Sequence, residues 1–257
     1  MILEWLAREG WIVFNWWALV TLAGLAALPL VMRLLGGLPD RGYTLARGVG
    51  LLLVGFTFWL LASLGLVPNT PGSAMLAWLI VLAVALAVYF RGGPPVDWRA
   101  WWRGNRPVVI VGELIFAGLL LGWALYRAHQ NSLIGTEKPM ELMFISSIMR
   151  SQAFPPNDGW LAGYAISYYY FGYVISAILS TLSGINSGTG FNMTISLLFA
   201  LTGLTSFGVV YNLVRSRGGE FARPALLTGL LGLVLVVFLS NFQPVVVEIP
   251  YQAQAVS

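Results

Sequence analysis

The feature that most restricts the fold of this chain is a series of long stretches without any charged side chain. Segments 10–32, 48–90 and 159–214 contain no Asp, Glu, Lys or Arg. A helix needs about 20 apolar residues to cross the hydrocarbon core of a bilayer. Charged residues make up 9% of the whole chain, compared with about a quarter in soluble domains. The chain is therefore predicted to be an integral membrane protein of the cell membrane.

Turn-forming residues divide these stretches into separate membrane spans. A Pro-Asn-Thr-Pro-Gly turn at 68–72 interrupts the second stretch, and a glycine-rich segment at 184–190 interrupts the third. The predicted spans are 11–32, 48–67, 74–90, 107–126, 162–183, 191–214 and 225–240. The sequence thus predicts an all-α, multi-pass protein with about seven transmembrane helices.

Arginines in the loops predict the orientation of the chain. Loops 33–47 and 91–106 fall on one side of the membrane and are rich in arginine, so the positive-inside rule places them in the cytoplasm. Loop 127–161 then faces outward. The arginines of 215–223 conflict with the rule, because seven spans place them outside as well. Either one late segment does not span, or these arginines have an outer purpose such as meeting a lipid phosphate.

Composition excludes several kinds of functional site. The chain has no cysteine, which excludes disulfides, thiolate nucleophiles and zinc sites built from cysteine. The single histidine, His129, excludes a metal cluster of histidines. The net charge of +4 comes from arginines spread over several loops, so nucleic-acid binding is not expected.

The outward loop differs in composition from the membrane helices. Thr136 has the side chain of a helix N-cap, and Glu137 would then lie in the first turn. Apolar residues follow at steps of three and four positions: Met140, Met143, Phe144 and Ile148. Such a helix is too short and too polar on one face to cross a membrane. We expect it to lie along the outer surface and to end before the Pro-Pro pair at 155–156.

Several short motifs occur here in an unusual combination. Thr-Glu-Lys-Pro-Met-Glu at 136–141 is followed by Phe-Pro-Pro at 154–156, by Asp158 and Trp160, and by Tyr-Tyr-Tyr-Phe-Gly at 168–172. In this order the motifs resemble the polytopic family called YYY membrane proteins. The chain departs from the family pattern at Glu141, Gly159 and Ser167.

The layout of that family resembles the GT-C glycosyltransferases, membrane enzymes that use polyprenyl-phosphate-linked sugars. The resemblance implies a GT-C-like module at 107–257 with its outer loop at 127–161, preceded by membrane helices at 1–106. It further implies a membrane-embedded glycosyltransferase, or the N-terminal part of one, because GT-C enzymes are generally longer. The implied partners are membrane lipid and a lipid-linked sugar donor.

Displacement of a lipid phosphate by an acceptor requires a carboxylate that takes the acceptor's proton. Glu137 matches the acidic position of the GT-C loop and is predicted to be this base. Asp158 is the second catalytic candidate, orienting the acceptor or holding a divalent cation. The predicted substrate-binding residues are Lys138, Arg127, Arg150, Trp160, Tyr168, Tyr169 and Tyr170, which would supply positive charge for the phosphate and aromatic surface for the sugar.

Each of these residues also has a structural interpretation. An acidic residue at a helix start is commonly a cap, an aspartate in a turn is commonly structural, and tyrosines near the end of a span commonly form an interfacial belt. Glu113 lies inside a predicted span, where carboxylates are costly and usually paired, and Arg106 is its predicted partner.

Two other classes of function stay open. A structural or accessory subunit would use small residues such as Gly203, Ser206 and Gly208 to contact the helices of a partner membrane subunit. A transporter or flippase would need charged groups that face one another within the spans. Only Glu113 is a candidate for such a group, so this function ranks last.

Overall fold

The computed structural model describes residues 2–93, 95–133, 137–217 and 222–239. Within these ranges the fold consists of α-helices and one short 3-10 turn, Tyr43–Leu45. The long helices are α1 (Ile2–Leu34), α2 (Ala46–Ser63), α3 (Pro71–Arg91), α4 (Trp98–His129) and α7 (Ser187–Ser216). The shorter helices are α5 (Lys138–Arg150), α6 (Phe171–Leu182) and α8 (Ala222–Val237). The prediction of an all-α fold is confirmed.

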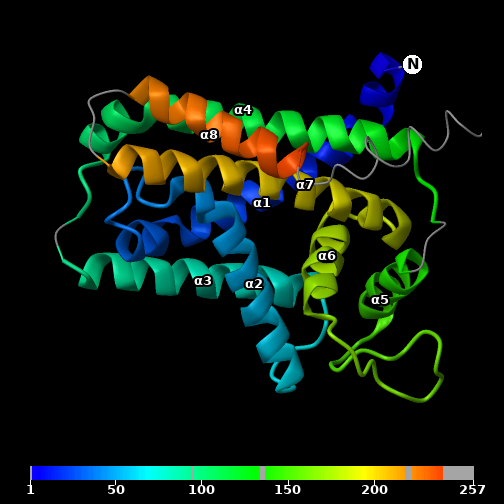
Figure 1. The fold of residues 1–257 in the computed structure, drawn as a ribbon. Coiled ribbons are helices and arrows are strands. Elements are labelled where there is room, and N and C mark those ends of the chain that lie inside the picture. The colour runs from blue at the N-terminus through cyan, green and yellow to red at the C-terminus, as the bar shows by residue number, and fades with distance from the viewer. Residues whose placement is uncertain (1, 94, 134–136, 218–221, 240–257) are drawn as a thin grey trace, which may run out of the picture.

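Five helices of the described ranges are long and apolar enough to cross a membrane, and they are the five long helices. They form one bundle, in which α2 is inclined relative to α1 and α3 (Figure 1). Large apolar side chains stay exposed on the outside of the bundle, among them Phe14, Leu79 and Leu198. Such a surface fits surrounding lipid and not water.

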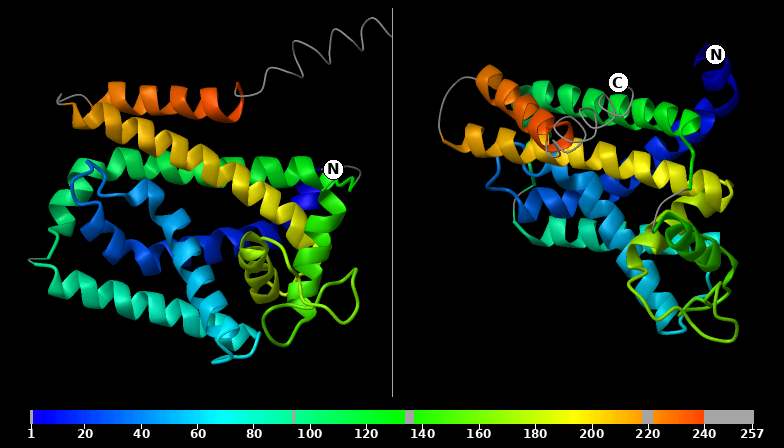
Figure 2. Two further views of the ribbon diagram at one scale, coloured as in Figure 1. Left: turned by 60° about the horizontal axis from the view of Figure 1, so that its bottom comes forward. Right: turned by 45° about the vertical axis from the view of Figure 1, so that its right-hand side comes forward.

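The structure differs from the prediction at 162–183, where no helix of membrane length forms. The helix α6 begins only at Phe171 and has 12 residues, which extend about 18 Å against a hydrocarbon core of about 30 Å. The preceding residues form a loop in which Gly163 has a positive φ and Ala165 pairs with Asn157. The helix α8 is also shorter than the long helices and lies along α7 (Figure 2).

Because α6 is short, α4 ends and α7 begins at the same end of the bundle. The helix α7 then runs back to the end that carries the α1–α2 and α3–α4 loops (Figure 1). Polar contacts join these segments: the Asp40 amide donates to Asn212 Oδ1 at 3.2 Å, and Trp101 Nε1 donates to the Asp40 carbonyl at 3.4 Å. This arrangement corresponds to the first predicted alternative, because the late segment 162–183 forms only a helix of 12 residues.

The two ends of the bundle differ in charge. Apart from Arg8, Arg127 and Arg150, all arginines of the chain lie in three segments at one end. Within the described residues these segments are 33–47, 91–93 with 95–106, and 215–217 with 222–223. We call this end the arginine-rich end, and we call the opposite end, which carries α5, α6 and loop 151–170, the cap end. The predicted boundary between 106 and 107 falls inside α4.

Glycines allow α1 and α2 to approach closely. A Cβ atom at Gly50 would lie 2.1 Å from the carbonyl oxygen of Ala23, and one at Gly24 would lie 3.1 Å from Arg47 Cα. Main-chain atoms cannot move aside as a flexible side chain can. This contact holds the first turns of α2, including Arg47, against α1.

We expect Gly50→Val to destabilise the protein by about 3 kcal/mol, because the added side chain meets the backbone of α1. The measurement is thermal unfolding of the purified protein in detergent. Gly48→Ala on the same helix is the matched control, because a Cβ there meets nothing within 4 Å. The control is expected to be neutral or to stabilise by up to about 1 kcal/mol. Equal losses in both variants would contradict the close contact.

Candidate functional site

The helix α5 lies at the cap end, outside the bundle of long helices, as expected of a surface helix (Figure 1). Phe144 and Ile148 of the predicted apolar stripe are buried. The predicted N-cap, Thr136, lies outside the described residues. Glu137 occupies the N-cap position, and its side chain makes no capping hydrogen bond. The geometry thus gives Glu137 no capping function.

Beside α5, a groove of about 540 Å³ runs between α2, α6 and α7. Its walls are mostly apolar and include Leu52 of α2 and Leu198 of α7, whose side chains are 55% and 60% exposed. The charged and phenolic side chains in its lining are Glu141, Tyr169 and Tyr173, all from the cap end. The groove therefore joins an apolar channel to a polar end.

Glu141 is the carboxylate that lines this groove. Tyr173 Oη donates a hydrogen bond to Glu141 Oε1 at 3.3 Å. Glu137 precedes it by one helical turn, with the Glu141 amide donating to the Glu137 carbonyl at 2.9 Å. Side chains four positions apart lie on the same helix face. Glu137 is exposed and Glu141 is half-buried, so the two carboxylates form a pair of which Glu141 is the inner member.

The rings of two tyrosines of the triplet lie against each other beside this pair, with their planes tilted by 34°. The ring centroids of Tyr168 and Tyr169 are 3.9 Å apart, and their hydroxyls are 2.9 Å apart. The hydrogen bond with Tyr168, together with desolvation and the charges of Glu137 and Glu141, raises the pKa of Tyr169 to about 12. Tyr169 is therefore even harder to ionise than an ordinary tyrosine, and its neutral hydroxyl can act as a hydrogen-bond donor at the groove.

Other predicted site residues lie away from the groove. Asp158 Oδ1 accepts hydrogen bonds from the amides of Trp160 and Leu161 at 2.8 and 3.0 Å, which closes a turn. Trp160 itself is 64% exposed. Tyr170 packs inward, where its hydroxyl accepts a hydrogen bond from Trp59 Nε1 at 3.2 Å. None of Asp158, Trp160 and Tyr170 lines the groove.

The three predicted cations are separated from one another. Lys138 lies in the first turn of α5, with its Nζ atom 3.4 Å from the Ser132 carbonyl. Arg150 is at the far end of α5, about 18 Å along the helix axis. Arg127 ends α4 and donates to Asn192 Oδ1 from Nε and Nη2 at 3.0 and 2.7 Å. Only Lys138 shares the first turn of α5 with the acidic pair.

Glu141 and Tyr173 were not predicted from the sequence to be site residues. The four-residue step from Glu137 to Glu141 was the signal that could have paired the two carboxylates. Within the described part of the chain, no three His, Cys, Asp or Glu side chains come together as a metal site.

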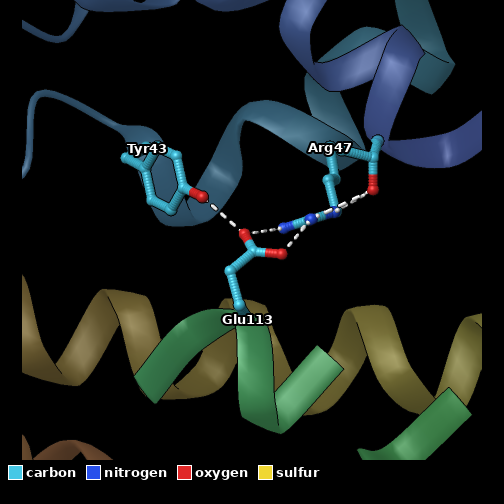
Figure 3. A network of polar contacts seen from close by, with 4 residues as sticks. Tyr43, Arg47 and Glu113 are labelled. Carbon is cyan, nitrogen blue, oxygen red and sulfur yellow. Dashed lines mark hydrogen bonds and ion pairs between the residues drawn. The ribbon is translucent and has the colours of Figure 1, made fainter. Parts of the chain in front are cut away.

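A second polar cluster lies between the long helices (Figure 3). Arg47 forms a two-pronged ion pair with Glu113, with Nη2–Oε2 at 2.6 Å and Nη1–Oε1 at 2.9 Å. Arg47 also donates to Thr21 Oγ1 at 3.1 and 3.3 Å, and the Tyr43 hydroxyl is hydrogen-bonded to Glu113. The guanidinium lies over the Phe116 ring, 4.5 Å from its centroid. The cluster ties α1, α2 and α4 together.

The predicted pairing of Glu113 with Arg106 is wrong. Arg106 precedes Glu113 by seven residues on α4, about 10 Å along the axis, whereas packing brings Arg47 of α2 directly beside the carboxylate. The pair is satisfied internally and crosslinks the helices.

Comparison with known proteins adds one finding to this geometry. The model of a family described as uncharacterized membrane protein (DUF2298) matches residues 53–254, well over half of the chain. The chain belongs to this family. No curated protein and no solved structure matches it. The expected membership of an uncharacterised polytopic membrane family is confirmed, and this DUF2298 member, with its five membrane-length helices, is a multi-pass membrane protein.

Proposed function

We propose that this protein transfers a sugar from a polyprenyl-phosphate-linked donor to an acceptor at the outer membrane surface. One observation carries the proposal: a lipid-facing apolar groove ends at a carboxylate, Glu141, and at two tyrosines, Tyr169 and Tyr173. An isoprenoid chain needs an apolar channel open to the bilayer. Its phosphate and sugar need polar groups at one end of that channel.

The proposed reaction is a direct displacement. The acceptor oxygen or nitrogen attacks the anomeric carbon, and the bond from that carbon to the phosphate oxygen breaks. The electron pair of the broken bond leaves with the lipid phosphate, while Glu141 takes the acceptor's proton. Tyr169 and Tyr173 hold the sugar, and Lys138 stabilises the charge of the phosphate. The configuration of the anomeric carbon is inverted.

Glu137, the base predicted from the sequence, is the second carboxylate of the proposed site. Magnesium is commonly held by one or two carboxylates together with substrate phosphate oxygens. Glu137 has the chemistry to hold such a divalent cation against the donor phosphate. In this proposal Asp158 has a structural function, because its side chain closes the turn with the amides of Trp160 and Leu161.

The outward orientation can be tested by labelling, because the arginine-rich end should face the cytoplasm. The chain has no cysteine, so single introduced cysteines report their own position. Trp160→Cys is expected to react with a membrane-impermeant maleimide in intact cells. Arg217→Cys is expected to react only after the membrane is opened. The reverse pattern would contradict an outward-facing site.

The groove can be tested with a photoreactive polyprenyl phosphate. Leu198→Trp fills part of the groove and is expected to remove most of the cross-linking to the protein. Leu79→Trp is the matched control, because Leu79 lines a different apolar groove of about 580 Å³ between α1 and α3. The assignment fails if Leu79→Trp removes the cross-link and Leu198→Trp does not.

The alternative is a non-catalytic accessory subunit. Two of the small residues considered for partner contact are used inside the chain: a Cβ at Gly203 would lie 2.3 Å from Leu119 Cδ1, and one at Gly208 would lie 2.1 Å from Thr44 Oγ1. These positions leave no room for a partner helix. Recovery of a second subunit in fixed stoichiometry, with silent carboxylate variants, would favour this alternative.

A further inference from the structure

A separate cavity of about 220 Å³ lies at the cap end between α1, α4 and α7. Its polar lining includes Glu9 of α1, Arg127 of α4, and Thr189 and Asn192 of α7. It shares no lining residue with the groove described above. The chemistry of this cavity is therefore independent of the proposed sugar transfer.

Arg127 is buried in the wall of this cavity, and the described residues supply it with no counter-charge. Arg127 as a whole residue is only 8% exposed. Asn192 donates from Nδ2 to the Gly188 carbonyl at 3.0 Å, which fixes its Oδ1 atom as the acceptor for Arg127. Across the described ranges, no carboxylate forms an ion pair with Arg127. A buried cation without a counter-charge is costly even when it is hydrogen-bonded, so the cavity favours an anionic ligand.

Glu9 gives the same cavity a negative charge at a second point. Its Oε2 accepts a hydrogen bond from Trp5 Nε1 at 2.8 Å, and its Oε1 lies 3.3 Å from the exposed Arg8. Glu9 and Arg127 line one cavity and form no ion pair with each other. Trp5 also lines the cavity, and indole rings attract ammonium groups. The lining thus suits a ligand that carries a phosphate and an amine.

The position of the cavity relative to the bilayer indicates the source of this ligand. The charge-free run of α1 begins at Gly10, directly after Glu9, and α4 carries no charge from 114 to 126, directly before Arg127. Both charges therefore lie just beyond the hydrocarbon region, at the level of lipid headgroups. The amino end of α7 adds the positive end of its helix dipole, which favours a phosphate.

We propose that this cavity binds the headgroup of a zwitterionic phospholipid of the phosphatidylethanolamine type. The phosphate lies against Arg127 and the amino end of α7. The ammonium lies against Glu9 and the ring of Trp5. The bound headgroup supplies the counter-charge that Arg127 lacks among the described residues, and it links the outer ends of α1, α4 and α7.

Native mass spectrometry of the purified chain, titrated with phosphatidylethanolamine or phosphatidylglycerol, tests this proposal. Wild type is expected to prefer phosphatidylethanolamine. Arg127→Gln should lose most of both lipids, whereas Glu9→Gln should lose only the preference, because phosphatidylglycerol has no ammonium. Arg150→Gln, an exposed arginine at the same end, is the matched control and should bind as wild type does.

Inorganic phosphate is the second arm of the experiment. If it displaces phosphatidylethanolamine and binds to wild type as tightly as the lipid does, the ligand is a free anion and the lipid assignment is overturned. Thermal unfolding checks that Arg127→Gln is folded. If Arg127→Gln does not fold, Glu9→Gln still tests the proposal, because Glu9 is half-exposed and its substitution is expected to leave the fold intact. Unchanged lipid preference in Glu9→Gln would overturn the proposal on its own.

Discussion

Glu141→Gln is expected to lower the rate of sugar transfer by about 10² to 10⁴, the range that a general base contributes. Glutamine keeps the size of the side chain and can still accept the hydrogen bond from Tyr173. It cannot take the proton that the acceptor loses as the new bond forms. The measurement is transfer from a radiolabelled polyprenyl-phosphate sugar in membranes that contain equal amounts of each variant.

Glu137→Gln is the matched variant, because Glu137 lies on the same helix face one turn away and is exposed. A smaller loss is expected there, together with weaker dependence on added magnesium. If Glu137→Gln abolishes transfer and Glu141→Gln does not, then Glu137 is the base, as the sequence motif implies. Wild-type rates in both variants would reject the enzyme and favour the accessory subunit. Failure of lipid binding at Arg127 would leave this result unaffected.

Arg47→Met is expected to destabilise the protein by about 3 kcal/mol, at the lower end of the cost of breaking a buried ion pair. The substitution leaves the Glu113 carboxylate inside the helix bundle without its cation. The Arg47 side chain is 6% exposed and that of Glu113 is 31% exposed, so water can reach the carboxylate in part. Thermal unfolding of the purified protein in detergent measures the loss.

The double variant Arg47→Met/Glu113→Gln separates charge from packing. It removes both charges and is expected to recover most of the stability lost in Arg47→Met. Tyr43→Phe removes one hydrogen bond to Glu113 and should cost about 1 kcal/mol. If the single and double variants are equally unstable, the stacking of Arg47 on Phe116 matters more than the ion pair, and the expectation is wrong.

The sequence predicted the long helices well because their signal is local. The charge-free run at 11–32 lies within α1, and the predicted spans 74–90 and 191–214 lie within α3 and α7. The surface helix at the cap end was also predicted, from its apolar stripe and the Pro-Pro pair that follows. Each of these signals depends only on residues a few positions apart along the chain.

The same local signal failed at 162–183. Hydropathy measures whether a segment is compatible with lipid, not whether it forms a helix long enough to cross. Here a turn closed by Asp158 and the packing of Phe144 against Tyr168, with ring centroids 5.7 Å apart, hold the first part of the segment in a loop at the cap end. Because 162–183 forms no helix of membrane length, the arginines of 215–223 lie at the arginine-rich end and not at the opposite end that seven spans predict.

Local sequence was enough to predict that this chain lies in a membrane and which end of its bundle carries the arginines of the first two basic loops, because solvation is a property of each segment alone. Which polar side chains meet depends instead on how the helices pack. The decisive pairs are Arg47 with Glu113, Arg127 with Asn192, and Tyr173 with Glu141. Each pair joins different helices, so it depends on which helix faces pack together, and no local pattern records that choice.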